Sequence, residues 1–212
     1  MCFLNRIQLI IAFECVLMCL LVASCKKEEG KHFYISDAFK RWTLFNKGSY
    51  WIYRNDSTLM MDSVFLKSDP QILEIPYSNT NLGASHEQIS TSFSSSFYNS
   101  SDILVDPDNS EHFRVYIDND FIFIPWALLA GSSDNFSSYP SLGDSYKLLS
   151  FDSVYYIGAV KFTNVVNTQA YDGFSRKRYT FWFAKDIGLI KLIGYNTNPD
   201  FSWNVIRFHI IH

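Results

Sequence analysis

The cysteines are the strongest nucleophiles in the chain, and all four lie close to its amino terminus. Cys15 and Cys19 lie within an apolar run at 7–22, Cys2 precedes that run, and Cys25 follows it after two small residues. A four-cysteine zinc site would place its ligands inside an apolar segment, so we expect no metal and no cofactor. If the chain is cleaved before Cys25, one thiol remains and no intramolecular disulfide can form. The fold would then be held by its core alone.

Oxygen and imidazole ligands occur, but their spacing does not favour a metal site. Residues 106–111, "DPDNSE", crowd several oxygen ligands yet lack the central Gly and late bidentate Glu of a calcium-binding EF-hand loop. Asp, Asn and Pro are also common turn residues. His209 and His212 are three apart, and such residues point to opposite faces of a strand. Catalysis by two carboxylates brought together from distant positions stays open.

Aromatic side chains make up 17% of the residues and could form a ligand surface. Exposed rings can line a sugar platform or an apolar concavity, although core packing is their more common use. The residues that we predict for such a surface are Trp51, Tyr156, Trp182 and Trp203.

One short motif carries a serine nucleophile. Gly143-Asp144-Ser145 resembles the nucleophile motif of GDSL-type hydrolases. That family places the motif early in the chain and requires a late Asp-x-x-His, which is absent here, and no G-x-S-x-G elbow occurs either. We interpret the motif as a polar turn before a strand. We therefore predict no catalytic residue and no enzymatic activity, and a hydrolase is the third of our hypotheses.

The amino-terminal segment has the layout of a secretory signal. Arg6 precedes an apolar run at 7–22, and the small residues Ala23 and Ser24 follow it. The run is shorter than the roughly 20 residues that span a bilayer. Gln8 and Glu14 also interrupt it. We therefore favour a cleaved signal peptide over a retained transmembrane helix.

The end of this segment resembles a known modification motif. Val22-Ala23-Ser24-Cys25 resembles the bacterial lipobox, with Val22 where that motif usually has Leu. The resemblance implies that Cys25 becomes the first residue of the mature protein and carries a diacylglycerol and an N-acyl chain. Two or more acyl chains hold a protein stably at a membrane. The membrane would then be a partner of this protein through its lipid anchor.

The residues after Cys25 resemble an export signal. Lys27, Glu28 and Glu29 resemble the surface-export signal of lipoproteins in Bacteroidota-type Gram-negative bacteria. This resemblance implies anchoring in the outer membrane with the protein facing outward, and the periplasmic leaflet is the alternative. The charged stretch also serves as a solvated tether.

Three serines follow aspartates in a pattern that resembles an O-glycosylation site of exported Bacteroidota-type proteins. They are Ser57, Ser63 and Ser153, and the first departs from the pattern because Thr58 follows it instead of an apolar residue. The motif is short, and Asp-Ser is also common at the start of a strand. We predict these serines as sites of O-glycosylation.

Composition is typical of one packed domain. The chain has 212 residues, with 48% hydrophobic and 18% charged residues and a net charge of −3. It has no basic block, which argues against nucleic acid as a partner. We predict a lipoprotein signal peptide at 1–24, a flexible tether at 25–35 and a β-rich domain at 36–212.

The periodicity of the mature chain is mostly two, as expected for strands. Ser36 can cap a short helix at 36–45, and a helical turn is expected at 126–134 before a loop at 137–145. Gly188 can take a positive φ in a tight turn at 185–188. The predicted strands are 48–56, 62–67, 71–77, 87–98, 112–118, 121–125, 152–166, 177–186, 188–196 and 202–211.

These elements predict a mainly β fold: a single antiparallel meander that forms a curved sheet or open half-barrel, with one or two short helices. The segments "KGSYWIYRND" (47–56) and "YTFWFAKDIGLIKLI" (179–193) resemble recurring parts of uncharacterised Bacteroidota-type lipoproteins. The implied shape is similar to the open half-barrel of lipoprotein-sorting carriers. No functional residue transfers from that similarity.

Two further hypotheses concern function. The first is a lipid-anchored envelope protein with a non-catalytic binding or structural role; its ligand is unknown, and the candidates are a glycan, a lipid or a protein. The second is a carrier that holds an apolar or lipid-like ligand in its curved sheet. A filled core between sheet and helix would disfavour the carrier, whereas an apolar cleft on the order of several hundred Å³ would support it.

Overall fold

The computed structural model describes residues 31–76, 84–95, 98–105, 111–117, 120–125, 145–173, 175–197 and 199–212. The chain divides into two compact units. The smaller comprises Met1–Lys31 and Tyr77–Ala84, of which the two residues Lys31 and Ala84 are described. The larger comprises His32–Pro76 and Ser85–His212, and the sheet, the helix and the clefts below all belong to it.

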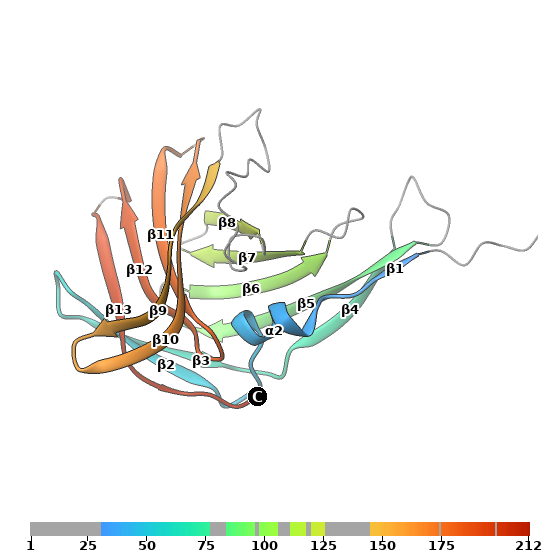
Figure 1. The fold of residues 1–212 in the computed structure, drawn as a ribbon, viewed down its shortest axis with the longest axis horizontal. Helices are drawn as coiled ribbons and strands as arrows, with labels where there is room; N and C mark the ends of the chain where they lie inside the picture. Colours follow the sequence, from blue (N-terminus) through green and yellow to red (C-terminus); the bar gives the residue numbers. More distant parts are fainter. Residues whose placement is uncertain are drawn as a thin grey trace, which may run out of the picture. The chain divides into compact units, whose positions relative to one another are not determined.

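Thirteen strands form one sheet in the larger unit (Figure 1). They are β1 (His32–Phe33), β2 (Tyr50–Asn55), β3 (Met61–Leu66), β4 (Gln71–Pro76), β5 (Ser85–Ser94), β6 (Tyr98–Val105), β7 (Glu111–Ile117), β8 (Asp120–Pro125), β9 (Ser145–Ile157), β10 (Val160–Asp172), β11 (Lys177–Ala184), β12 (Gly188–Tyr195) and β13 (Phe201–His209). Their order is β8-β7-β6-β5-β3-β2-β13-β12-β11-β10-β9, and β1 and β4 also pair with β5. The predicted fold class is confirmed: the protein is mainly β, and its sheet is open because β8 and β9 do not pair.

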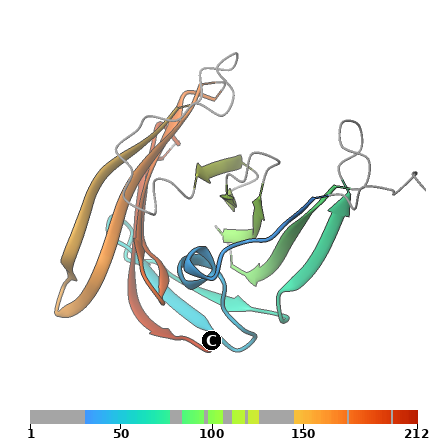
Figure 2. The same cartoon turned by 45° about the vertical axis from the view of Figure 1, so that its right-hand side comes forward.

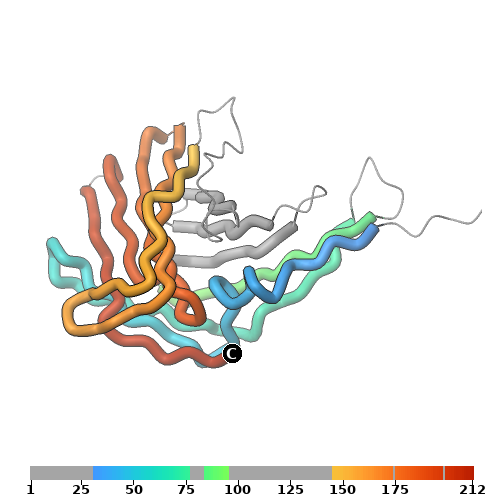
Figure 3. Tube along the Cα trace, in the orientation of Figure 1, coloured from blue at the N-terminus to red at the C-terminus, as the bar shows by residue number. Residues whose placement is uncertain are grey.

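The sheet consists of two antiparallel meanders that meet in its middle. One runs from β9 to β13 and the other from β5 to β8. They are joined through β2 and β3, because β13 pairs with β2 and β3 pairs with the end of β5. Figure 3 shows β2 in cyan beside β13 in red, although 145 residues separate the end of the first from the start of the second (56 to 200). The sheet therefore contains a pairing between strands that are far apart in the sequence, in addition to pairings between consecutive strands.

The described helix, α2 (Asp37–Thr43), forms as the sequence predicts. The Ser36 hydroxyl accepts a hydrogen bond from the Phe39 N–H at 3.2 Å, and Asp37 lies in the first turn, where a negative charge is favoured. Phe39 and Trp42, three residues apart, are both buried. Figure 2 shows α2 beside one face of the sheet.

Most predicted strands lie within a few residues of those observed, but the strand predicted at 152–166 is wrong. This stretch contains the turn of a hairpin, in which Ile157 pairs with Val160 around Gly158-Ala159. Gly158 has a φ of +58°, which a glycine adopts without strain. The apolar side chains on both sides of the turn disguised the break. The long hairpin of β9 and β10 that results is central to the site described below.

Other predicted segments fall at the borders of the described residues. The helical turn at 126–134 lies outside them, as does the loop at 137–145 except for Ser145, which begins β9. Within the stretch predicted as a tether, His32 and Phe33 form β1 and pair in parallel with β5. The predicted domain boundaries stay predictions.

Candidate functional site

The two faces of the sheet differ in chemistry across β11, β12, β13 and β2. Trp182 pairs with Lys191, Lys191 with Asn204, and Asn204 with Arg54. Directly paired residues point to the same face, so these four side chains form one row, which we call the polar row. The face that carries it is the cleft face.

The opposite face, the core face, is mostly apolar, although the buried Asn55 pairs with Trp203 there. Phe181 pairs with Leu192 and Leu192 with Trp203, one residue along each strand from the polar row. Phe181 and Leu192 are both fully buried. Because side chains alternate between faces, one row of this sheet is polar and the next is core.

A segment of the β9–β10 hairpin covers the cleft face. β10 pairs with β11 only from Val165 onward, so Asp152–Asn164 extends beyond β11, and we call this segment the arm. Asn164 has a φ of +52°, a left-handed conformation that redirects the chain there. The Tyr155 ring stacks on Trp182 at a centroid distance of 6.3 Å, and Phe162 contacts Phe208 at 5.9 Å. These contacts hold the arm against the sheet.

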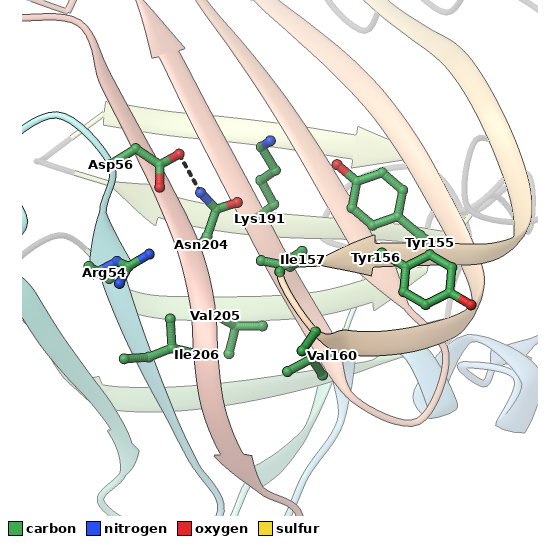
Figure 4. Close-up of a pocket in the computed structure, with 12 residues that line it drawn as sticks. Arg54, Asp56, Tyr155, Tyr156, Ile157, Val160, Lys191, Asn204, Val205 and Ile206 are labelled. Carbon is green, nitrogen blue, oxygen red and sulfur yellow. Dashed lines mark hydrogen bonds between the residues drawn. The ribbon is translucent and has the colours of Figure 1, made fainter.

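A cleft of about 410 Å³ lies between the arm and the sheet (Figure 4). Its lining combines charged, amide, phenol and aliphatic side chains. The lining residues are Arg54, Asp56, Tyr155, Tyr156, Ile157, Gly158, Ala159, Val160, Lys191, Asn204, Val205 and Ile206.

The polar groups on one wall of the cleft are fixed by hydrogen bonds. The Asn204 side-chain amide donates to Asp56 Oδ2 at 2.5 Å, drawn as a dashed line in Figure 4, and the Ser202 hydroxyl donates to the same oxygen at 2.9 Å. The Asp56 N–H also donates to the Ser202 carbonyl oxygen at 2.9 Å. Asn204 is buried, so this wall is held rigidly before any ligand arrives.

Two cations line the same cleft. The Lys191 ammonium lies 5.0 Å from the centroid of the Trp182 ring, a cation–π contact that positions it. Arg54 extends from β2. In the part of the chain that the structure describes, neither cation forms an ion pair with a carboxylate. The cleft therefore contains two positive side chains and one negative side chain, Asp56.

Tyr155 contributes a neutral hydroxyl to the cleft. Burial raises the pKa of Tyr155, and the nearby Asp152 carboxylate raises it further. The phenol is consequently protonated at neutral pH and can donate a hydrogen bond. In Figure 4 the Tyr155 hydroxyl and the Lys191 ammonium lie on the same side of the cleft.

Of the four residues predicted for a ligand surface, Tyr156 lines the cleft and Trp182 contacts two residues that line it. Tyr156 is 61% exposed and lines the cleft, and Trp182 lies beneath Lys191 and Tyr155. Trp51 is 3% exposed and lies in the core, where its indole N–H donates to the Ile187 carbonyl at 2.7 Å. Trp203 is half-buried in the core-face row.

Sequence reasoning missed the polar members of the cleft. Arg54, Asp56, Lys191 and Asn204 come from three separate segments of the chain, and only the β2–β13–β12 pairing assembles them. Lys191 is a single charged residue in an apolar strand, and Asn204 alternates with Ser202, but neither pattern indicates which strands are neighbours.

The core face has very little free space beneath α2. A pocket of about 20 Å³ lies there, room for about one water molecule. Phe45 fills most of the gap: a Cβ on Gly188 would lie 2.8 Å from its Cε2, and Gly188 has the predicted positive φ, at +91°. The lining residues are Trp42, Thr43, Phe45, Trp51, Tyr53, Val64, Phe93, Phe183, Gly188 and Leu189.

One cluster contains a serine, a histidine and an acid. His32 Nδ1 lies 2.5 Å from the Ser85 hydroxyl and 3.2 Å from Glu74 Oε1, and the Ser85 hydroxyl lies 2.7 Å from the same Glu74 oxygen. A catalytic triad needs the serine and the acid on opposite ring nitrogens of the histidine. Here both contact Nδ1, so the cluster joins β1, β4 and β5 and does not have the order of a triad.

The remaining predicted positions fall into two groups. Ser57 and Ser153 are exposed, Ser63 is half-buried in β3, and glycosylation of all three stays a prediction. Cys25, Lys27, Glu28 and Glu29 lie outside the described residues, as do Gly143 and Asp144.

The described residues contain neither a candidate metal site nor a candidate membrane-spanning helix. No group of three or more His, Cys, Asp or Glu side chains there could hold a metal ion. No helix among them is long and apolar enough to cross a membrane.

Comparison with known proteins gave little. No protein-family model and no curated protein matches the chain. Among solved structures, it is similar to a Bacteroides fragilis protein classed as exported and as having a YmcC-like fold, with 11% identity and a TM-score of 0.34. That match covers 80% of this chain and 99% of the other.

Proposed function

We propose that the protein is a lipid-anchored protein of the bacterial cell envelope that binds a ligand in the cleft beneath the arm without transforming it. The observation that carries the binding role is the cleft itself, with its fixed Asp56–Asn204 wall and two cations that form no ion pair with a carboxylate among the described residues. Its volume falls within the range of about 300–1,000 Å³ that is typical of small-molecule sites.

The non-catalytic part of the proposal is supported by geometry. Catalysis of acyl transfer needs a nucleophile, a base and an orienting acid in hydrogen-bonded sequence. The cleft lining contains no Ser, Cys or His, and the one Ser-His-acid cluster described above has the wrong order. An enzyme acting through the cleft would have to use Asp56, Lys191 or a tyrosine.

The anchoring part of the proposal is supported by the sequence. The apolar run and Val22-Ala23-Ser24-Cys25 imply acylation at Cys25, and Lys27, Glu28 and Glu29 imply an outward-facing position in the outer membrane. The alternative orientation is the periplasmic leaflet. The net charge of −3 gives no support to a nucleic-acid partner.

The alternative role, carriage of an apolar ligand in the curved sheet, has less support. A carrier needs an apolar cavity, whereas the pocket between α2 and the core face holds about 20 Å³. The larger cleft lies on the other face and contains charged groups, which an apolar ligand would desolvate at a cost.

Metabolic labelling tests the anchoring. Cells that express the full-length protein are fed an alkyne analogue of palmitate, and the wild type is compared with Cys25→Ala. We expect label and membrane association in the wild type and neither in the variant. Proteinase accessibility on intact cells, with Lys27, Glu28 and Glu29 replaced by Ala as the comparison, reports the orientation. Mass spectrometry that finds an intact leader and a free Cys25 thiol would overturn the proposal.

A further inference from the structure

We propose that the cleft binds a carboxylated saccharide, with the carboxylate between Arg54 and Lys191. This inference rests on the proposed binding function and specifies its ligand. Asp56, the negative side chain among the lining residues, already accepts hydrogen bonds from Asn204 and Ser202. The two cations have no ion-pair partner in the described part of the chain. An anionic group is the ligand feature that would complete this arrangement.

The cleft is lined by both apolar and polar side chains, which indicates the chemistry of the part of the ligand that does not carry the charge. Ile157, Val160 and Ile206 present aliphatic surface, while Asn204 and the neutral Tyr155 hydroxyl present hydrogen-bonding groups. A sugar ring has the same combination, because its hydroxyl groups alternate with C–H surface. A purely apolar anion would offer no partner to the Tyr155 hydroxyl, which is unfavourable in a partly buried site.

The cation–π contact fixes where the charge is presented. Lys191 is directly paired with Trp182 across β11 and β12, and its ammonium is held over the indole ring. Tyr155 stacks on the same indole and belongs to the arm. The arm, the indole and the ammonium therefore form one assembly, and binding of a carboxylate to Lys191 would also hold the arm in place.

The sheet offers a matched control outside the cleft. Arg178 and Tyr195 are also directly paired across β11 and β12, with the guanidinium 4.3 Å from the ring centroid. Neither residue lines the cleft. Lys147, exposed on β9, also lies away from it. Arg178→Gln and Lys147→Met thus match Arg54→Gln and Lys191→Met in charge removed and differ in location.

The experiment measures binding of a defined probe to the purified full-length lipoprotein in detergent, by calorimetry and saturation-transfer NMR. The probe is a tetrasaccharide of alternating glucuronate and N-acetylglucosamine, and its partner is the same tetrasaccharide with the carboxyl groups reduced to alcohols. We expect the acidic probe to bind at least tenfold more tightly than the reduced one. We also expect its affinity to fall as salt is raised.

The variants locate the interaction. Arg54→Gln and Lys191→Met should each weaken binding of the acidic probe about tenfold or more, which corresponds to the loss of one charge-assisted contact. Arg178→Gln and Lys147→Met should leave it unchanged, and thermal melting checks that all four variants are folded. Equal binding of both probes, binding of neither, or equal loss in the control variants would overturn the inference. Inorganic phosphate that binds at Lys191 more tightly than the acidic probe would also overturn it.

Failure of this inference can be told apart from failure of the proposed function. If neither probe binds but palmitate labelling at Cys25 persists, the saccharide is the wrong ligand class and the anchored role stands. If NMR shows the probe cleaved after incubation, the non-catalytic role is wrong.

Discussion

The two faces of the same strands are covered in different ways. On the core face, α2 and Phe45 leave about 20 Å³ free above Trp51 and Leu189. On the cleft face, the arm leaves about 410 Å³ free above Lys191 and Asn204. The free volumes differ because α2 buries two aromatic side chains against the core face. The arm contacts the sheet through the rings of Tyr155 and Phe162 and leaves space beside them. A site forms where the covering element is narrow and the row beneath it is polar.

The most destructive test of this comparison is to remove bulk from the core face. Phe39→Ala deletes a fully buried ring from α2, and large-to-small changes of this kind cost about 3–5 kcal/mol. We expect that loss in the free energy of unfolding from urea titration. Tyr156→Ala, at an exposed ring on the arm, should cost below about 1 kcal/mol as its comparison. Equal losses in the two variants would mean that the faces do not differ in packing.

A smaller change tests the hydrogen bonding of the core face. The buried Tyr53 hydroxyl donates to the Leu189 carbonyl oxygen at 2.6 Å and so ties β2 to β12 across β13. Tyr53→Phe removes this buried hydrogen bond, with an expected cost of about 1–3 kcal/mol. The same change at exposed Tyr156 should have almost no effect on the melting temperature. A neutral Tyr53→Phe would indicate that water replaces the hydroxyl and that the core face is wetter than described.

The attachment of the arm is weaker, so its loss should be local. Tyr155→Ala removes the stack on Trp182, and aromatic pairs contribute about 0.5–1.5 kcal/mol beyond their burial. We expect faster amide hydrogen exchange in Asp152–Asn164 with unchanged exchange in β11 and β12. Val154→Ala, at a half-exposed position of the same arm, is the control. Faster exchange throughout the sheet would show that the arm is part of the core.

The smallest expected effect is at the turn between β11 and β12. Arg41 donates to both carboxylate oxygens of Asp186, which holds the pKa of Asp186 below its usual value. A carboxylate with a lowered folded pKa adds stability above its ordinary pKa and loses it as the pH falls through the folded value. Asp186→Asn, which also tolerates the left-handed turn, should lower the melting temperature slightly at pH 7. Below the ordinary Asp pKa of about 3.9 the difference should shrink.

This titration also tests whether Arg41 and Asp186 behave as a surface ion pair. Both partners of the Asp186–Arg41 pair are substantially exposed, so a large effect at neutral pH would contradict the expectation for a surface ion pair. A difference that grows as the pH falls would assign the effect to another group.

Local features of the fold were predictable from the sequence, because they depend on neighbours in the chain. The Ser36 cap, the alternation of Ile89, Thr91 and Phe93, and the positive φ of Gly188 are examples. The hairpin turn at Gly158-Ala159 was missed, since the apolar residues around it continue a strand-like pattern. Alternation of side chains along this stretch is the same for one long strand and for two strands of a hairpin, so it could not reveal the turn.

The site was not predictable in the same way, because its parts are remote in sequence. Tyr156 and Trp182 were chosen for their aromatic rings, and the same reasoning chose Trp51, which lies in the core. Trp51 differs from these two residues in the face of the sheet on which it lies. The cleft face is set by the pairing of β2 with β13, which places Arg54 next to Asn204. Register between distant strands follows from the whole sheet and leaves no local pattern.

The position of β13 has a consequence for how the molecule is made. Among the described strands it bridges β12 and β2, and it is the one with the highest residue numbers. The ribosome therefore supplies β13 after the strands on both sides of it, and the edges of β12 and β2 stay unpaired until it arrives. Translation that stops, or a protease that cuts, shortly before Phe201 would leave two half-sheets with no strand to connect them. Such a product should be cleared or should aggregate.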